Sequence, residues 1–302
     1  MRANPVPLIL LMAGAATPAL ADTAEPVSRH LWDTEIILGL SGLELDPTGT
    51  AFTAIGDRGF WMTGKLVRSG QDITEIVVDS VDAILGPDGY PVAARRVGDW
   101  SDAEGLAIAP DGTAWVSFER WAHVWRYEDG LSGPASFIRD HPTFYDHADN
   151  WQLEAAAISP EGDLYTFSEK PLPNGFPIYR LSSEGWVIDG TLPETDLFSI
   201  VGADFDEAGD LYLLERKLVM GFWWQSRLRR VRLDGTEDRI LWTSQRGDFG
   251  NLEGLALWRD GDTLMMTAVS DNNGNLGTPT EWVDFRLVPA PADPIDADGP
   301  EG

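Results

Sequence analysis

The chain has 302 residues, of which 43% are hydrophobic and 10% aromatic, including 13 tryptophans. This apolar content is enough for a sizeable core and excludes a disordered chain. The 49 acidic residues outnumber the 22 basic ones and give a formal net charge of −27. Such a field repels phosphate backbones and anionic membranes, so we expect a monomer that does not bind nucleic acid. Cysteine is absent, which excludes disulfides and thiolate catalysis.

Residues 1–21 have the pattern of a Sec-type signal peptide. Arg2 provides a basic start, an apolar stretch runs from Val6 to Ala16, and Ala19-Leu20-Ala21 forms a small-x-small cleavage site. The alternative for this segment is a buried N-terminal helix. We predict cleavage after Ala21 and a periplasmic or secreted protein. The apolar stretch is too short to span a bilayer and no later segment approaches 18 apolar residues, so no transmembrane helix is expected.

Five segments of the chain repeat one pattern, in which a short apolar strand, a turn centred on glycine and a second strand follow one another. The central glycines are spaced 63, 50, 47 and 52 residues apart and are Gly49, Gly112, Gly162, Gly209 and Gly261. A period near 50 is typical of a propeller blade. Weaker strands such as HVWRYEDG and RLRRVRLDG follow each pair and would complete four strands per blade.

The fold predicted from these repeats is a single all-β propeller over residues 30–288, with five or six four-stranded blades. The long first gap and the strands of residues 73–97 leave room for a sixth, degenerate blade. The extended stretch from His30 to Leu38 is expected to close the ring by pairing with the last blade, because an open ring would expose strand edges. Residues 289–302 are rich in Pro and Asp and are expected to form a disordered acidic tail.

Carboxylates recur at fixed places in the repeats. Glu104 and Glu119 stand 15 residues apart at the outer ends of one strand pair, and Glu154 and Glu169 stand in the same places of the next. The corresponding pairs are Ser41 with Asp57, Val201 with Glu215 or Arg216, and Glu253 with Asp271. Because the innermost strands of a propeller run along its channel, these side chains should gather at one mouth of it.

Hard carboxylate oxygens gathered in this way suit Ca²⁺ or Mg²⁺. The expected metal ligands are Asp57, Glu104, Glu119, Glu154, Glu169, Glu253 and Asp271. The alternative is that each acid pairs with an arginine, or accepts backbone N–H bonds from the next blade, as a latch repeated in every blade.

The ordered segments GLSGL…GDRG, DAEGLAIAPDGTAWVSFER, LEAAAISPEGDLYTFSEK and NLEGLALWRDGD…VSDNN resemble the phytase-like propeller family, often labelled "esterase-like activity of phytase". The resemblance covers about residues 35–288 and implies an exported bacterial propeller that hydrolyses phosphoesters or esters. The positions that match its pattern are Asp57, Arg58, Glu104, Glu119, Arg120, Glu154, Glu169, Glu215, Arg216, Glu253, Asp271 and Asn272. The fourth repeat departs from it, with Val201-Gly202 where an acid is expected.

The chain lacks the G-x-S-x-G elbow, the P-loop and the dinucleotide glycine motif, so metal-activated water is the hydrolytic mechanism that remains. We predict that Glu104 and Glu154 serve catalysis at a bound ion and that Arg58, Arg120 and Arg216 hold an anionic group of a small ester or phosphoester. No organic cofactor is expected. The alternatives are a gluconolactonase-like, metal-dependent lactonase and a non-catalytic propeller that binds a ligand or protein.

Three further groups are weaker candidates. His141, Asp146, His147 and Asp149 share one loop, for which a hydrophilic connection is favoured over a metal site because the spacing matches no zinc pattern. Trp121, Trp223 and Trp224 follow the carboxylates and are candidates for an apolar wall or for core packing. The run from Asp271 to Asn275 is rich in oxygen ligands and turn formers.

Overall fold

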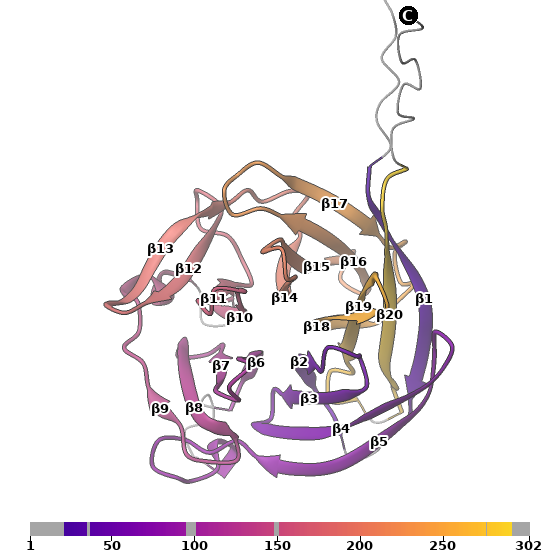
Figure 1. Ribbon diagram of the computed structural model, residues 1–302. Coiled ribbons are helices and arrows are strands. Elements are labelled where there is room, and N and C mark those ends of the chain that lie inside the picture. The colour runs from indigo at the N-terminus through magenta and orange to yellow at the C-terminus, as the bar shows by residue number, and fades with distance from the viewer. Residues whose placement is uncertain (1–20, 35–36, 95–100, 148–150, 276, 292–302) are drawn as a thin grey trace, which may run out of the picture.

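The computed structural model describes residues 21–34, 37–94, 101–147, 151–275 and 277–291. These residues form five antiparallel sheets of four strands, which Figure 1 shows arranged as the blades of a ring. The all-β propeller is therefore confirmed, and the blade number is five. The predicted signal peptide and most of the predicted tail lie outside the described residues.

The strands of each blade follow from the channel outwards in chain order, except in the last blade. Blade 1 contains β2 (Leu40–Leu45), β3 (Ala51–Gly56), β4 (Phe60–Ser69) and β5 (Asp72–Ala83). Blade 2 contains β6 (Ala103–Ile108), β7 (Ala114–Phe118), β8 (His123–Leu131) and β9 (Ser136–Phe137). Blade 3 contains β10 (Leu153–Ile158), β11 (Leu164–Ser168), β12 (Phe176–Ser182) and β13 (Gly185–Leu192).

The remaining two blades complete the ring. Blade 4 contains β14 (Ser199–Phe205), β15 (Leu211–Val219), β16 (Trp223–Val231) and β17 (Asp238–Thr243). Blade 5 contains β18 (Asn251–Asp260), β19 (Thr263–Asp271), β20 (Thr280–Val288) and, outermost, β1 (Thr23–Trp32). The helices among the described residues are two short 3₁₀ turns, η1 (Val92–Ala94) and η2 (Pro142–Asp146). Neither is long and apolar enough to cross a membrane.

The ring is closed by β1, which pairs antiparallel with β20 from Thr23 opposite Val288 to Trp32 opposite Thr280. Pairing with the last blade is thus confirmed, but the predicted closing stretch, His30 to Leu38, is wrong in position because the strand begins at Thr23 and ends at Trp32. The strand contains Pro26, although proline has no N–H to donate to a ladder. Here it stands at a bulge in an outermost strand, where a missing N–H is tolerated.

The described part of the stretch predicted as a sixth blade, residues 73–94, does not form one. Its first part lies in β5, which pairs with β4 along its length from Ser69 opposite Asp72 to Phe60 opposite Ala83. The long first spacing between repeats therefore comes from a long outer hairpin in blade 1 and the segment that leads to blade 2.

Every innermost strand carries a register shift near its start. The shifts fall between Ala103 and Leu106 in β6 and between Leu252 and Gly254 in β18, with equivalents in the other three blades. A small residue stands at or beside each shift, and these residues are Gly42, Gly105, Ala155, Gly202 and Gly254. A β-bulge of this kind bends the strand and re-aims the adjacent side chain.

The glycines at these bulges let neighbouring innermost strands approach backbone to backbone. A Cβ on Gly105 would lie 2.6 Å from the backbone nitrogen of Ala156 in blade 3, and one on Gly254 would lie 2.6 Å from the carbonyl oxygen of Ser41 in blade 1. Separations this short are not tolerated, because close-packed interiors cannot give way at backbone atoms. The bulge glycines therefore set how tightly the ring closes around the channel.

We predict that Gly105→Ala lowers the free energy of unfolding by about 1 to 3 kcal/mol or more, since the added methyl group overpacks a backbone contact between blades. Chemical denaturation would measure the change. Gly133→Ala is the matched control, because no atom lies within 4 Å of its added Cβ. Equal stabilities for the two variants would contradict the inferred close approach.

Two half-buried carboxylates join neighbouring blades. Glu44 of blade 1 accepts the backbone N–H of Ile108 of blade 2 at 3.0 Å, and Asp204 of blade 4 accepts that of Leu257 of blade 5 at 2.7 Å. One form of the latch considered as an alternative, acceptance of a backbone N–H from another blade, therefore occurs at Glu44 and Asp204, which are not among the predicted ligands. The other form, pairing with an arginine, occurs at Glu154, Glu169 and Glu253, which contact Arg216 of blade 4. Burial raises the pKa of Asp204 to about 7 and, together with the charge of Asp204, that of Glu44 well above its usual range.

We predict that Asp204→Asn flattens the dependence of stability on pH. A carboxyl group whose pKa is raised in the folded chain contributes stability below its unfolded pKa, near 3.8, and this stability is lost as the pH rises to about 7. The loss in the unsubstituted protein is on the order of 4 kcal/mol. Unfolding at pH 4 to 8 would measure it, with Asp260→Asn on an exposed hairpin as control for the lost charge. Parallel pH profiles for the unsubstituted and Asp204→Asn proteins would refute the prediction.

Candidate functional site

The bulges in the innermost strands aim one residue of each blade at the channel. These residues are Ser41, Glu104, Glu154, Val201 and Glu253. A second set stands where the second strand of each blade ends its pairing with the innermost strand. Its member follows the last paired residue in blades 1, 2 and 3, and is itself the last paired residue in blades 4 and 5. The second set consists of Asp57, Glu119, Glu169, Arg216 and Asp271. Three blades thus contribute two carboxylates each, blade 1 contributes one, and blade 4 contributes an arginine instead.

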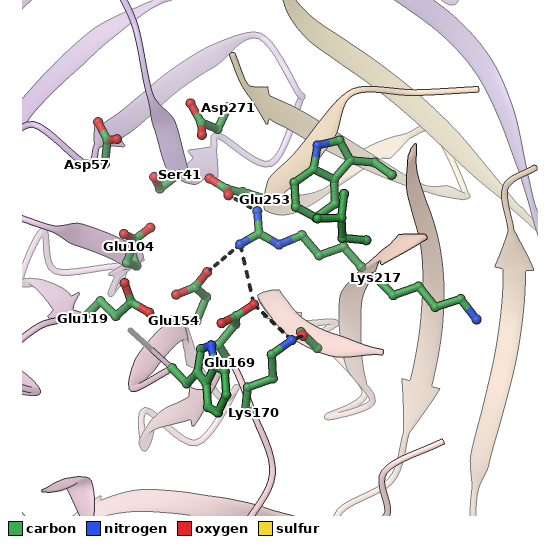
Figure 2. A pocket seen from close by; sticks show the side chains of 15 residues that line it. Ser41, Asp57, Glu104, Glu119, Glu154, Glu169, Lys170, Lys217, Glu253 and Asp271 are labelled. Atoms are coloured by element: carbon green, nitrogen blue, oxygen red, sulfur yellow. Dashed lines mark hydrogen bonds and ion pairs between the residues drawn. The ribbon is translucent and has the colours of Figure 1, made fainter. Parts of the chain in front are cut away.

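All members of the two sets except Val201 line one cavity of about 430 Å³ at the channel mouth, which we call the acidic cavity (Figure 2). Its lining residues are Ser41, Asp57, Glu104, Glu119, Trp151, Glu154, Glu169, Lys170, Ser199, Arg216, Lys217, Leu218, Trp224, Glu253 and Asp271. All seven carboxylates predicted as metal ligands line it. The volume lies within the range of small-molecule sites.

Arg216 lies among these carboxylates. Its Nη2 atom is 3.2 Å from Glu154 and 3.8 Å from Glu169, and Nη1 donates to Glu253 (Figure 2). Nη1 also contacts Oδ1 of Asn251 at 2.5 Å. The guanidinium therefore bridges carboxylates of blades 3 and 5, and the charges of Glu253 and Glu154 raise its pKa despite burial.

The remaining cations of the cavity compensate little of the negative charge. Lys170 pairs with Glu169 at 3.4 Å and also donates to Ser199. Lys217 turns away, with its ammonium group 4.3 Å from the ring centre of Phe198 and 3.3 Å from the carbonyl oxygen of Asp196. Seven carboxylates thus face one fully engaged guanidinium and one ammonium group.

This imbalance shifts the titration of the carboxyl groups upwards. Burial raises the pKa of Asp57 to about 7, with the charges of Asp271 and Asp102 acting in the same direction. Burial and the charge of Asp102 raise the pKa of Glu119 to about 8. Burial also raises the pKa of Glu253 to about 7, although Arg216 opposes it.

The pKa values of two further buried glutamates of the cavity are also raised. Burial and the charges of Glu154 and Glu253 raise the pKa of Glu104 well above its usual range. Burial and the charge of Glu169 raise the pKa of Glu154 in the same way, against the effect of Arg216. Such clusters hold protons at neutral pH unless a cation neutralises them.

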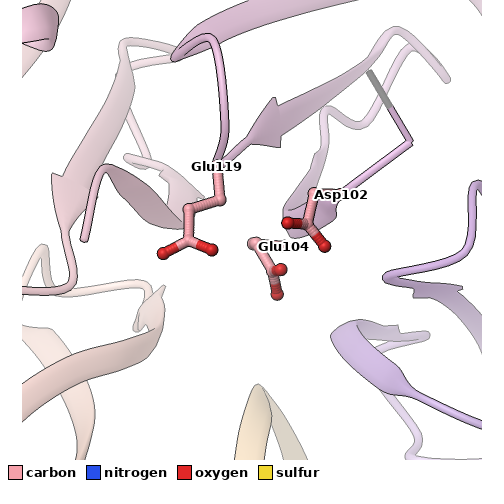
Figure 3. A group of neighbouring side chains, drawn as sticks. All are labelled: Asp102, Glu104 and Glu119. Carbon is pink, nitrogen blue, oxygen red and sulfur yellow. The ribbon is translucent and has the colours of Figure 1, made fainter. Parts of the chain in front are cut away.

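One group of oxygens is spaced for a metal ion. Atoms of Asp102, Glu104 and Glu119 all lie within 4.8 Å of one another, and the three carboxyl groups converge in Figure 3. Ligands at 2.3 to 2.6 Å from one Ca²⁺ are at most about 5 Å apart, so this spacing fits that ion. Asp102 also pairs with Arg120 at 3.2 Å.

Asp102 was missed by the sequence argument, which considered only the first and last strand positions of each repeat. It stands directly before β6, and its carbonyl oxygen accepts the N–H of Glu119. The equivalent residue in blade 3 is Gln152, whose carbonyl accepts the N–H of Glu169. The sequence does contain an acid two residues before Glu104, but the equivalent position in the other blades has no acid.

Several polar atoms of the residues that line the cavity form no hydrogen bond among the described residues. Oε2 of Glu154, Oδ1 of Asp57 and Oγ of Ser41 are buried and form no hydrogen bond there. Glu154 is only 4% exposed. Buried oxygens without hydrogen bonds are costly, so these atoms are available to bind water, an ion or a ligand.

The other predicted residues lie elsewhere. Arg58 and Arg120 are about half exposed and do not line the cavity. Glu215 points to the opposite side of β15 from Arg216, where it is buried between Arg227 and Arg229. The sequence left open which of Glu215 and Arg216 faces the channel, and the structure assigns Arg216.

The run beginning at Asp271 has divided roles. Asp271 lines the cavity, whereas Asn272 accepts the N–H of Gly39 at 3.2 Å and donates to the carbonyl of Thr278. Asn272 therefore ties the end of β19 to the entrance of blade 1.

The residues of the histidine loop and the three tryptophans lie in different places. His141 caps η2 through the N–H of Thr143, and His147 packs against Tyr179, while Asp149 lies outside the described residues. Of the three predicted tryptophans, Trp224 lines the cavity, but Trp121 and Trp223 do not. Trp151, which the sequence argument did not single out, lines it as well.

Comparisons with known proteins agree with the fold. The chain is similar to an aldose sugar dehydrogenase from Streptomyces coelicolor, whose structure was determined with PQQ bound, at 14% identity and a TM-score of 0.50 over 90% of this chain and 100% of that one. It is also similar to a provisionally assigned gluconolactonase at 16% identity and a TM-score of 0.48, over 83% of this chain and 76% of that one. It is also similar to a virginiamycin B lyase from Staphylococcus aureus at 12% identity and a TM-score of 0.46, over 88% of this chain and 100% of that one. At these identities, the similarity to the dehydrogenase shows the propeller fold alone.

The family comparison is more specific. No curated protein matches the chain. The family model described as "Phytase-like: Esterase-like activity of phytase" matches residues 36–274, which is more than three quarters of the chain and includes every carboxylate of the acidic cavity. The chain therefore belongs to this phytase-like family.

Proposed function

We propose that the protein is an exported hydrolase of small esters or phosphoesters that depends on a divalent cation, Ca²⁺ or Mg²⁺, bound in the acidic cavity. The observation that carries this proposal is the excess of converging, buried carboxylates over cations in one cavity of ligand size. Family membership supports a hydrolase, and the signal-peptide pattern of residues 1–21 supports export.

Asp102, Glu104 and Glu119 are the residues that would hold the cation, because their oxygens already lie within 4.8 Å of one another. The remaining carboxylates of the cavity are available as further or water-mediated ligands. When bound, a divalent cation would polarise the carbonyl or phosphoryl group of the substrate and activate water for attack.

The chain's own residues would orient the substrate and move protons. Glu154 presents a buried Oε2 atom without a hydrogen-bond partner among the described residues, and we assign this atom the exchange of a proton with water or the leaving group. Arg216 contacts Oε1 of the same carboxylate at 3.2 Å and thereby fixes its orientation.

The arginines divide into two kinds. Arg216 is engaged by three carboxylates, so its main role would be to position them rather than to bind an anion. Arg58 and Arg120 are about half exposed beside the cavity residues Asp57 and Glu119 and would contact an anionic group of the substrate.

The first test is metal binding. We predict that Ca²⁺ or Mg²⁺ raises the thermal stability of the chelated protein, by about 2.7 kcal/mol at a concentration of 100 times Kd. Metal content and thermal unfolding with Ca²⁺, Mg²⁺ and Zn²⁺ would measure it. Glu104→Gln is expected to abolish the shift, whereas Glu44→Gln, which removes a half-buried carboxylate outside the cavity, is expected to retain it.

Absence of both metal and stabilisation in the unsubstituted protein would overturn the cation-dependent mechanism. The carboxylates would then serve packing, and the non-catalytic binding propeller would be the better interpretation.

The second test is turnover. We predict that 4-nitrophenyl phosphate or 4-nitrophenyl acetate is hydrolysed in the presence of Ca²⁺ or Mg²⁺ and that chelation abolishes this activity. Glu154→Gln is expected to lower kcat by about 10²- to 10⁴-fold, the usual contribution of general acid or base catalysis. Colorimetric release of 4-nitrophenol would measure both, with Glu44→Gln as control.

Other outcomes of the same panel have definite meanings. Turnover of δ-gluconolactone without turnover of either nitrophenyl substrate would replace the proposal by a gluconolactonase-like lactonase. Activity that survives complete chelation would exclude the metal mechanism. Lack of turnover on every substrate, with saturable binding of a ligand, would favour a binding propeller.

A further inference from the structure

The hairpin formed by β15 and β16 extends further at the channel mouth than its equivalents. In blades 1, 2 and 3 the second strand ends at Gly56, Phe118 and Ser168, directly before the residue that faces the cavity. In blade 4 the pairing continues beyond Arg216 to Val219, which lies opposite Trp223. The hairpin therefore projects past the ring of carboxylates.

The projecting part is almost entirely apolar, with the sequence LVMGFWW from Leu218 to Trp224. Leu218 and Trp224 are register partners, and both line the acidic cavity. At the tip, Met220 is 74% and Phe222 61% exposed. Half-exposed Trp151 of the segment before β10 lines the same cavity.

The base of this hairpin is held in place. The Trp224 ring lies 5.1 Å from the guanidinium carbon of Arg216, which is itself fixed by carboxylates. The carbonyl of Trp224 accepts the N–H of Gly247 at 2.7 Å, and Gln225 donates to the carbonyl of Ser244. The base of the hairpin is therefore held in place by these contacts, while the apolar side chains at its tip are exposed and do not pack in the core.

We propose that the tip of the β15–β16 hairpin, together with Trp151, forms an apolar subsite for the aliphatic or aromatic group of the substrate, whose polar end lies among the carboxylates of the acidic cavity. This rests on the proposed function, which it deepens by naming an ester or phosphoester with an apolar group as the substrate class. The occupant is the substrate because Leu218 and Trp224 line the same cavity as the carboxylates, which makes the apolar surface continuous with the polar chamber.

Binding of n-alkylphosphonates in the presence of Ca²⁺ tests the subsite without requiring turnover. These compounds resist hydrolysis and resemble both a phosphoester and the tetrahedral stage of ester hydrolysis. Calorimetry from methyl- to octylphosphonate is expected to show affinity rising about fourfold for each methylene that is buried, which corresponds to about 0.8 kcal/mol. In the double variant Met220→Ser/Phe222→Ser, the ratio of octyl to methyl affinity is expected to fall at least tenfold.

The matched control is Phe137→Ser, which removes an equally exposed phenylalanine (73%) from β9, the outermost strand of blade 2. It is expected to leave the affinity ratio unchanged. Affinity that does not depend on chain length in the unsubstituted protein would overturn the subsite. An unchanged ratio in the double variant would do the same, and loss of self-association in that variant would then identify the tip as an interface between copies of the chain.

The two proposals fail separately. Chain-length-dependent binding that the double variant loses, without hydrolysis of any ester, would support the subsite and overturn the hydrolase. If the unsubstituted protein and the double variant both hydrolyse 4-nitrophenyl butyrate and 4-nitrophenyl acetate, and the KM is the same for the two substrates in each protein, the result would support the hydrolase and overturn the subsite.

Discussion

The close approach of the innermost strands is the constraint on which both the ring and its site depend. Gly105 and Gly254 lie so near the next blade that a Cβ would come within 2.6 Å of its backbone. The strand can bring its backbone this close only by bulging, and the bulge turns the preceding residue into the channel. The packing of the ring and the convergence of Glu104, Glu154 and Glu253 are therefore consequences of one backbone feature.

The convergence of the carboxylates in one cavity creates electrostatic repulsion that apolar packing does not relieve. Carboxyl groups drawn into one cavity resist ionisation together, and burial and mutual repulsion raise the pKa of both Glu104 and Glu154. Arg216 relieves this on one side by bridging blades 3 and 5. On the side of blade 2, Asp102 adds a further acid. A contact between blades does not require several carboxylates in one place. Glu44 and Asp204 each join two blades by accepting one backbone N–H group.

The sequence predicted the fold and most of the cavity because both follow from the repeat. The spacing of the glycine turns defines the blades, and equivalent positions such as Glu119 and Glu169 must lie together in a ring. Asp102 escaped prediction because it has no acidic equivalent in the other blades. The closing strand was misplaced because its partner strand is about 250 residues away. The sequence left open the choice between Glu215 and Arg216, because the register of the fourth repeat was not fixed. In the structure they alternate along a regular β15, and the register shift lies in β14.

The departures from symmetry concentrate in blade 4. It has Val201 where three blades have glutamate, Arg216 where the others have a carboxylate, and an apolar hairpin that overlaps the cavity. Arg216 relieves the repulsion among the carboxylates, but exposure of Met220 and Phe222 adds nothing to the packing of the ring. These changes give the cavity a charged side and an apolar side. A cavity with two chemically different sides orients a ligand that has a polar and an apolar end, and this asymmetry is what distinguishes a binding site from a repeated contact.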